Sequence, residues 1–271
     1  MGNPGLNNPI GCQHNGVHLI APGSIMARKK WIGGIYLVGI GIKGLDQLTF
    51  EAHDLLRKCR VIYAFTGQQK IFSKKYRNVI DMEDAYWKAD SFQKIYKKIV
   101  RTVVKDALDG GRVAIVTYGH PLVFDSVSLN IIKQARKKGI STQVIPGISC
   151  LDTMVVDLEI DFGNGMQIFD AEDVVVSNIA INPEIDLLLM QVGALGIEAP
   201  NRLDFSTKNR LRPLARYLKK KYKRNRQAII LFSDDGNGLP VKIKTTVAKI
   251  EEYEEEVVSG TTLYIPGSHL N

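Results

Sequence analysis

Three glycines near the start of the chain have the spacing of a phosphate-binding turn. Gly39, Gly41 and Gly44 satisfy G-x-G-x-x-G directly after the predicted strand 35–38, and such a turn lets the backbone approach a dinucleotide pyrophosphate. A dinucleotide site also requires an acid at the end of the next strand, to bind a ribose hydroxyl. That strand ends Ala64-Phe65-Thr66-Gly67. The missing acid argues against NAD, and it leaves two interpretations of the glycines, a tight turn or a site for another ligand.

Histidine and cysteine, common zinc ligands, form no metal-binding pattern in this sequence. None of the histidines is spaced with a partner acid as a zinc ligand would be, and the cysteines, Cys12, Cys59 and Cys150, are far apart and odd in number. We therefore predict no metal and no disulfide framework, and we expect a cytoplasmic, reducing compartment. No apolar run reaches the roughly 18 residues of a membrane span.

Positive charge is concentrated in one segment. The chain has 36 Lys and Arg against 28 Asp and Glu, a formal net charge of +8, and residues 216–226 read RYLKKKYKRNR. A basic run of this kind can bind a nucleic acid or an acidic peptide. Apolar residues at helical spacing, Leu211, Leu214, Tyr217 and Leu218, favour a solvated helix face instead. We predict neither a nucleic-acid nor a membrane partner.

Predicted strands and helices alternate from residue 35 onward. The first half is predicted to contain strands 35–38, 60–65, 113–117 and 142–145 and helices 49–58, 91–108 and 126–138. After Pro146-Gly147 we predict strands 174–181, 186–192, 228–233, 241–244 and 261–265 and helices 208–222 and 245–254. Short connections between alternating elements indicate an α/β fold with open, mostly parallel sheets.

The domain organisation follows from this pattern. We predict two α/β domains, 33–150 and 151–271, with the active site in the cleft between them, because ligands bind at the carboxyl ends of strands in open sheets. Residues 1–32, rich in Gly, Asn and Pro, are interpreted as a disordered leader. The overall composition, 45% hydrophobic and 24% charged, excludes a collagen-like or wholly disordered chain.

Three stretches of the sequence resemble a known family when taken together. Residues 35–65 contain IYLVGIGIKGLDQLTF, residues 113–126 read VAIVTYGHPLVFDS, and residues 142–150 read TQVIPGISC. They resemble the opening strand and glycine turn, the Gly-His-Pro loop and the PG(I/V)S turn of the tetrapyrrole methylase superfamily, the class III S-adenosylmethionine (SAM) methyltransferases. The resemblance covers residues 35–266, and it implies the two-domain fold of that superfamily with SAM as cofactor.

One branch of the superfamily resembles the chain more than the others. Tyr118-Gly-His120-Pro, Pro146-Gly-Ile-Ser149 and the segment DLEIDFG at 157–163 are similar to the borosin peptide backbone α-N-methyltransferases. That resemblance implies a ribosomal precursor peptide as substrate and a homodimer. Because the sequence stops five residues after Pro266, we expect the split form of these enzymes, in which the peptide is a separate chain.

The resemblance also implies a set of cofactor-binding residues. The loop residues Tyr118, His120, Val123 and Phe124 match the family's cofactor loop, and Cys150 follows the PGIS turn at a cofactor-contacting position. Gln191 matches a residue near the adenosine, and Thr261 and Thr262 match a pair that closes on the adenine. The residues themselves leave other interpretations open: Tyr118 and Phe124 as core aromatics, and the two threonines as ordinary strand residues.

The catalytic residues that the resemblance implies are tyrosines. Tyr86 and Tyr96 match two members of a Tyr–Arg–Tyr cluster, and Tyr118 is a candidate third phenol. The arginine has no counterpart in residues 87–95, WKADSFQKI, where only Lys88, Gln93 and Lys94 are suitably polar. An amide nitrogen is a poor nucleophile because its lone pair is delocalised, so the site must stabilise an imidate-like oxyanion. Phenols can donate that hydrogen bond or, when ionised, act as a base.

Other functions fit parts of this pattern. A methyltransferase of the same fold could act on a small corrinoid or porphyrin precursor. The missing arginine motivates another hypothesis, a SAM- or peptide-binding protein without catalysis. Nucleic-acid binding by residues 216–226 is a fourth hypothesis, and Tyr96 also fits a core position on a buried helix stripe.

Overall fold

The computed structural model describes residues 32–200, 210–233 and 238–268. Apart from Ile32, the leader predicted over residues 1–32 lies outside the described residues. Residues Ile32–Asn271 form one compact unit, which contains two five-stranded sheets. The division into domains at residue 150 stays a prediction.

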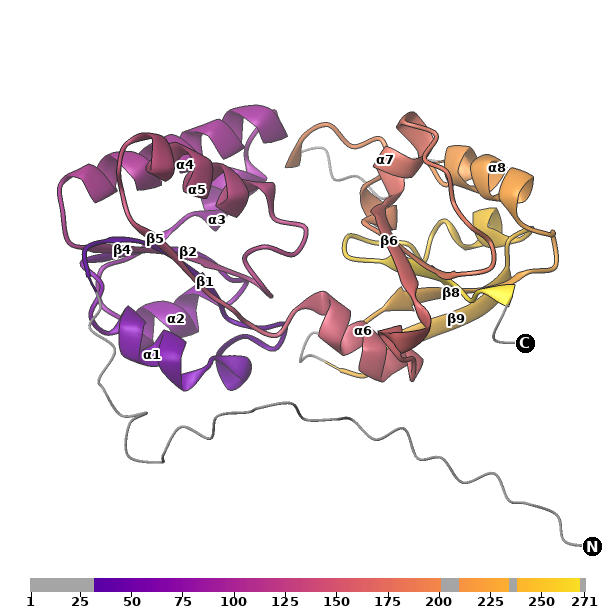
Figure 1. Cartoon of the computed structure of the whole chain (residues 1–271), viewed down its shortest axis with the longest axis horizontal. Helices are drawn as coiled ribbons and strands as arrows, with labels where there is room; N and C mark the ends of the chain where they lie inside the picture. The colour runs from indigo at the N-terminus through magenta and orange to yellow at the C-terminus, as the bar shows by residue number, and fades with distance from the viewer. Residues whose placement is uncertain (1–31, 201–209, 234–237, 269–271) are drawn as a thin grey trace, which may run out of the picture. The chain divides into compact units, whose positions relative to one another are not determined.

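The first sheet is entirely parallel (Figure 1). Its strands follow the order β3-β2-β4-β1-β5. They are β1 (Gly34–Gly39), β2 (Val61–Phe65), β3 (Val79–Asp81), β4 (Arg112–Thr117) and β5 (Thr142–Ile145). The four strands predicted in this half are therefore confirmed, and β3 is an additional one.

Helices cover both faces of this sheet. In Figure 1, α1 (Phe50–Leu56) and α2 (Gln69–Lys75) lie on one face, and α3 (Glu83–Trp87), α4 (Phe92–Leu108) and α5 (Ser126–Lys137) lie on the other. The first turn of α4 is capped by Ser91, whose hydroxyl accepts a hydrogen bond from the Lys94 amide. Apolar residues of α4 pack against β1, β2 and β4, which fixes the side of the sheet that the helix covers: Ile95, Ile99, Val100, Val103 and Val104.

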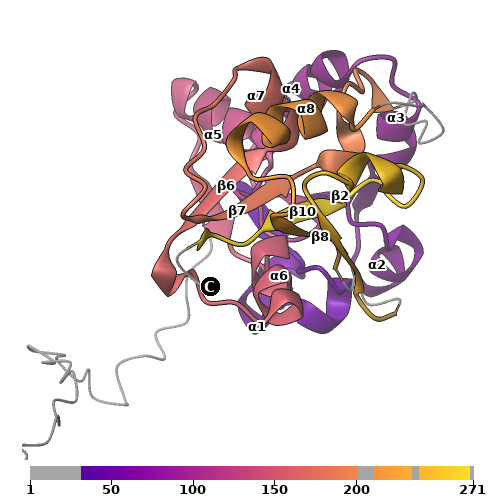
Figure 2. The same cartoon turned by 90° about the vertical axis from the view of Figure 1, so that its right-hand side faces the viewer.

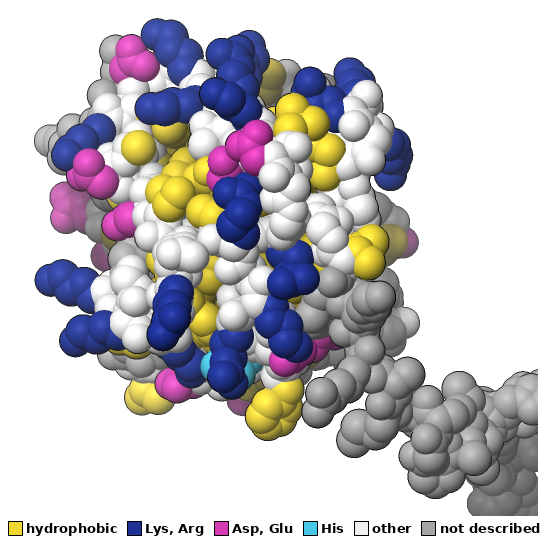
Figure 3. All heavy atoms as spheres, turned by 90° about the vertical axis from the view of Figure 1, so that its left-hand side faces the viewer, with side chains coloured by type: hydrophobic (Ala, Val, Ile, Leu, Met, Phe, Trp, Pro, Cys, Tyr) yellow, Lys and Arg dark blue, Asp and Glu magenta, His cyan; other side chains and the backbone are white. Residues whose placement is uncertain are grey.

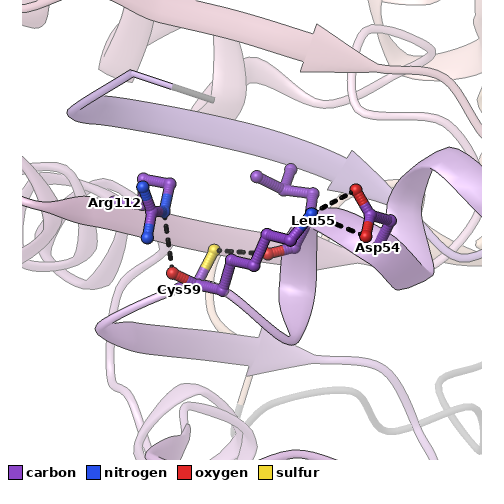
Figure 4. A network of polar contacts seen from close by, with 5 residues as sticks. Asp54, Leu55, Cys59 and Arg112 are labelled. Atoms are coloured by element: carbon purple, nitrogen blue, oxygen red, sulfur yellow. Dashed lines mark hydrogen bonds and ion pairs between the residues drawn. The ribbon is translucent and has the colours of Figure 1, made fainter. Parts of the chain in front are cut away.

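Local contacts attach the end of α1 to the sheet, as Figure 4 shows. The Arg112 guanidinium at the start of β4 donates from Nε to the Lys58 carbonyl at 2.7 Å. The Cys59 thiol donates to the Leu55 carbonyl, with a sulfur–oxygen distance of 3.5 Å. Burial raises the pKa of Cys59 to about 12, so this thiol is neutral and has a packing role.

The loops after β1, β4 and β5 meet at the carboxyl edge of the first sheet. A Cβ atom on Gly39 would lie 2.4 Å from the Gly119 carbonyl oxygen and 2.7 Å from the Gly147 nitrogen. Gly41 pairs with Gly119 in an isolated antiparallel bridge. Glycine is required where backbones approach this closely, so the structure supports the tight-turn interpretation of the glycine motif.

The second sheet is mixed, whereas the sequence pattern predicted mostly parallel sheets. Its order is β6-β7-β10-β8-β9. Only β6 and β7 pair in parallel, and β10 pairs antiparallel with both β7 and β8. The strands are β6 (Met166–Asp170), β7 (Asp186–Met190), β8 (Gln227–Phe232), β9 (Val241–Thr246) and β10 (Thr262–Ile265).

Both faces of the second sheet are also covered. In Figures 1 and 2, α7 (Ala171–Val176) and α8 (Arg212–Lys221) lie on one face and α6 (Cys150–Leu158) on the other. Alternate residues of β7 show the same division, since Leu187 and Leu189 pack with α7 and α8 while Leu188 and Met190 pack with α6. The described residues of this half also form the short 3-10 helices η2 (Phe162–Asn164), η3 (Val192–Ala194) and η5 (Ile250–Tyr253).

Two predicted elements of the second half are wrong. The strand predicted at 174–181 is instead the end of α7 and a turn, because Asp170 caps the helix and Glu172 and Asp173 place negative charge at its first turn. The helix predicted at 245–254 is also wrong, since β9 continues to Thr246 and only the 3-10 turn η5 follows. The predicted helix 208–222 begins later, at Arg212, and its residues 208–209 lie outside the described residues.

On the face in Figure 3, Lys and Arg side chains are scattered among polar and apolar ones. Within residues 32–200, 210–233 and 238–268, no helix has both the length and the hydropathy of a bilayer span.

Candidate functional site

A pocket of about 950 Å³ contains most of the side chains that the sequence singled out. Its walls come from the loop between β4 and α5, from α3, α4 and α6, and from the segments after β7 and before β10. Eight of the ten predicted site residues line it: Tyr86, Tyr96, Tyr118, His120, Val123, Phe124, Cys150 and Gln191. Residues separated by up to about a hundred positions along the chain therefore share one pocket.

Thr261 and Thr262 are not among the lining residues. Both are buried, Thr261 at 1% and Thr262 at 0% exposure. The Thr261 hydroxyl accepts a hydrogen bond from the Val258 amide at 3.0 Å, which shapes the turn that brings Ser259 and Gly260 to the pocket. Their role at the adenine stays a prediction, and the contacts in the structure are those of turn and strand residues.

The loop after β4 is held in an uncommon conformation. Phe124 has a φ of 53°, and Gln191, which also lines the pocket, has a φ of 59°. Residues other than glycine seldom adopt these left-handed angles, and such strain concentrates at functional sites. The His120 ring is also fixed, because its Nδ1 accepts a hydrogen bond from the Leu122 amide at 3.0 Å. In the neutral ring the proton is then on Nε2.

Tyr86 and Tyr96 form a stacked pair inside an aromatic cluster. Their ring centroids are 6.2 Å apart with an interplanar angle of 18°, and Phe65 and Phe92 also contact the pair. The Tyr86 hydroxyl donates a hydrogen bond to the Tyr96 oxygen. Burial raises the pKa of both phenols above the ordinary value of 10.0. At neutral pH they are therefore hydrogen-bond donors rather than bases.

A carboxylate lies near this phenol pair. Asp125 lines the pocket at the start of α5, and its charge helps to raise the pKa of both Tyr86 and Tyr96. Burial in turn raises the pKa of Asp125, against hydrogen bonds from Ser128 that lower it.

Two hydroxyls of the pocket lining have no hydrogen-bond partner in the described part of the chain. They are Oγ1 of Thr117, at the end of β4, and Oγ of Ser233, after β8. Thr117 is only 9% exposed. Since buried polar groups are almost always hydrogen-bonded, these hydroxyls are suited to bind a polar ligand.

The charged residues of the lining are acidic. Asp125, Asp170 and Glu172 line the pocket, and its described lining residues include no Lys or Arg. The proposed substitutes for the missing arginine lie elsewhere: Lys88 and Lys94 are about three-quarters exposed and pair with Asp84 and Asp90, and Gln93 is exposed. Burial raises the pKa of the Cys150 thiol, so Cys150 adds no charge. No cluster of possible metal ligands is found among the described residues.

Three residues of the pocket were not predicted from the sequence: Thr117, Asp125 and Ser233. Two of them lie within the stretch VAIVTYGHPLVFDS at residues 113–126, so their position next to the predicted loop residues was available. Their burial and their orientation to the pocket were not, because they depend on the packing of α4 and α5 against the sheet. Ser233 had no local signal at all.

The chain matches a known protein family over more than half of its length. The family model of the Tetrapyrrole (Corrin/Porphyrin) Methylases matches residues 34–192. Among solved structures, the chain is similar to uroporphyrin-III C-methyltransferase from Thermus thermophilus, with a TM-score of 0.63, 17% identity, and coverage of 87% of this chain and 92% of that one. It is also similar to cobalt precorrin-4 methyltransferase, with a TM-score of 0.59, 11% identity, and coverage of 86% and 94%.

The names of two curated relatives combine a methyltransferase with a cyclic peptide precursor. The chain is 27% identical over 241 residues to the methyltransferase/dendrothelin A cyclic peptide precursor of Dendrothele bispora. It is 28% identical over 241 residues to the corresponding omphalotin A precursor of Omphalotus olearius. In each case the alignment covers 86% of this chain and 58% of the relative. The chain therefore spans little more than half the length of these relatives.

Proposed function

The chain belongs to the tetrapyrrole (corrin/porphyrin) methylases, the two-sheet SAM-dependent methyltransferases, and from that premise we propose that it methylates backbone amide nitrogens of a peptide. The peptide relatives support this proposal, because the names of those proteins join a methyltransferase to a ribosomal peptide precursor. We propose a homodimer as the active form, as the borosin resemblance implies. Light scattering tests this, because it measures the molar mass of the protein in solution.

The pocket fits the cofactor of this family. Its 950 Å³ lie at the upper end of the roughly 300–1,000 Å³ of small-molecule sites, which leaves space for an acceptor beside the donor. The unpaired Thr117 and Ser233 hydroxyls can bind the polar groups of SAM. We assign Tyr118, His120, Val123, Phe124, Cys150 and Gln191 to its binding. When bound, SAM supplies an electrophilic methyl group on a sulfonium.

The observation that carries the choice of substrate is the charge of the pocket lining. Corrin and porphyrin precursors carry several carboxylates, and a site for them requires cations. The described lining has three carboxylates and no Lys or Arg, so it would repel such molecules. A peptide backbone with apolar side chains is neutral and fits the aromatic walls formed by Phe65, Tyr86 and Phe92.

The residues of the pocket have complementary tasks in this reaction. The aromatic walls exclude water and hold the peptide with its amide next to the methyl group. The neutral phenols of Tyr96 and Tyr118 donate hydrogen bonds to the amide oxygen as negative charge develops there. Tyr86 supports this by donating its own hydrogen bond to the Tyr96 oxygen, which orients the Tyr96 hydroxyl. These phenols take the role of the arginine that is missing from the Tyr–Arg–Tyr cluster.

The test is direct methylation of added peptides. The purified protein is incubated with SAM and a set of neutral, apolar peptides, and the mass of each peptide is measured by mass spectrometry. The proposal predicts a mass gain of one methyl group or more that requires SAM. SAM binding without methylation of any peptide would support the non-catalytic hypothesis instead.

A further inference from the structure

Asp125 is a carboxylate of the pocket lining that has no role in the reaction steps proposed above. Its Oδ1 accepts a hydrogen bond from the Ser128 amide at 3.0 Å, and its Oδ2 accepts one from the Ser128 hydroxyl at 2.7 Å. These bonds cap α5 and fix the direction of the carboxylate. The residue before it, Phe124, has the left-handed φ of 53°. A rigid loop therefore holds Asp125 at the pocket wall.

Amide methylation needs a proton acceptor, and the phenols do not provide one. The acceptor nitrogen loses its proton as the new bond forms, and the buried phenols of Tyr86 and Tyr96 are un-ionised at neutral pH. The Cys150 thiol is un-ionised for the same reason. His120 already uses its Nδ1 as the acceptor for the Leu122 amide.

Asp125 lies where it can accept the amide proton. It caps α5, and Val127 in the first turn of that helix packs on the same apolar cluster as Tyr86 and Tyr96. Asp125 also lines the same pocket as both phenols, so it lies on the side of the pocket where those phenols would hold the amide. Proton transfer by a positioned side chain contributes roughly 10²–10⁴-fold to a rate.

On the basis of the proposed function, we propose that Asp125 is the catalytic residue that accepts the proton of the substrate amide. The amide nitrogen forms its bond to the methyl carbon while the carbon–sulfur bond breaks and leaves its electron pair on sulfur. The N–H proton passes to the Asp125 carboxylate, which afterwards releases it to water.

The variant Asp125→Asn separates this task from helix capping. Asparagine caps a helix about as well as aspartate but cannot accept the proton. We expect the single-turnover rate of peptide methylation to fall by about 10²-fold or more, with the affinity for S-adenosylhomocysteine within about threefold of wild type, measured by calorimetry. The matched control is Asp161→Asn, an exposed cap of η2 that accepts from the Gly163 amide and should methylate at the wild-type rate.

The pH profile is a readout that a capping role would not change. The wild-type rate should fall in acid as Asp125 becomes protonated, and Asp125→Asn should lose that limb. The other titratable groups that face the pocket are common to both proteins: Tyr86, Tyr96, Tyr118, His120, Cys150, Asp170 and Glu172.

The outcomes distinguish this inference from the proposed function. An active wild type with an Asp125→Asn rate within threefold of it overturns the inference alone, and so does a rate loss matched by an equal loss of S-adenosylhomocysteine affinity. A wild type that methylates no peptide overturns both. If Asp125→Asn does not fold, Asp125→Ser keeps a capping hydroxyl and gives the same comparison.

Discussion

Tyr86 is the residue at which the chemistry of the amide can be tested with the smallest change. Replacing it with phenylalanine removes one hydroxyl and leaves the stacked contact with Tyr96 and the edge-to-face contact with Phe65 in place. Because the Tyr86 hydroxyl donates to Tyr96 and so orients the phenol that donates to the developing oxyanion, Tyr86→Phe should slow methyl transfer by about tenfold or more. Single-turnover kinetics with a peptide substrate measures this.

The matched control is Tyr63→Phe in the same sheet. The Tyr63 hydroxyl is bound to Asp106 at 2.8 Å and does not line the pocket, so the control should keep its rate even where stability changes. Equal slowing of both variants would show that a general loss of packing, and not the loss of the hydrogen bond to Tyr96, explains the Tyr86 effect.

Asp125 also gives a prediction for stability. Burial raises its pKa above 3.8, so the folded protein holds this proton more tightly than the unfolded chain. The associated stability is complete below the unfolded pKa and is lost as the pH rises through the folded pKa. Asp125→Asn should therefore gain stability relative to wild type as the pH rises from about 4 toward neutral.

Thermal unfolding of both proteins across this pH range measures the difference. Asp161→Asn serves again as the control, because Asp161 is exposed and does not line the pocket. A difference between Asp125→Asn and wild type that does not change with pH would contradict the prediction.

At the residue scale, most of the candidate site was predictable from the sequence. Eight predicted residues line one pocket, because their motifs follow strands whose carboxyl ends meet at one edge. The motifs did not indicate the protonation state of the two phenols. That depends on burial, which keeps Tyr86 and Tyr96 neutral and makes them donors.

Among the elements, α6 depends on a capping box. The Ser149 hydroxyl accepts from the Asp152 amide at 3.4 Å, and the Asp152 carboxylate accepts from the Ser149 amide at 2.6 Å. Hydrogen bonds from Ser149 are the main cause that lowers the pKa of Asp152. Ser149→Ala should reduce the free energy of unfolding by about 1 kcal/mol.

Urea denaturation measures this change. Ser73→Ala is the control, since Ser73 is exposed within α2 and a surface substitution of this kind usually changes stability by less than about 0.5 kcal/mol. Equal effects of the two substitutions would mean that the capping box does not stabilise α6.

The elements also show where pattern reasoning failed. The parallel strands β1, β2, β4 and β5 are short apolar runs between helices, and the prediction found all of them. Val174-Val175-Val176 is an equally β-branched run but is helical, because the cap at Asp170 and the acids after it outweigh the strand preference. Strand β6, MQIFD, was not predicted, because its two polar residues, Gln167 and Asp170, interrupt a short apolar pattern.

At the scale of the whole molecule, the pocket charge predicts which substrates compete. Its carboxylates should repel an acidic peptide, because like charges in a partly buried site are poorly screened. A peptide with one central Leu→Glu change should have a lower kcat/KM than its parent, by about tenfold or more. A Leu→Gln peptide controls for lost hydrophobicity and should fall less, and equal losses would contradict the electrostatic argument.

Fold class was also predictable at this scale, since alternating strands and helices with short connections indicate α/β sheets. The antiparallel pairing in the second sheet was not predictable, because it depends on which strands meet after folding. Strand β10 lies between β7 and β8, far from β7 in the sequence.

The most direct test of the central claim is the position of the transferred methyl group. A neutral, apolar peptide is incubated with the protein and SAM, and tandem mass spectrometry locates each added methyl. We predict methyl groups on backbone nitrogens, and none at a position where proline has replaced the residue and removed the N–H. Methyl groups only on side chains, or methylation of a carboxylate-rich tetrapyrrole precursor while every peptide is left unchanged, would contradict the account.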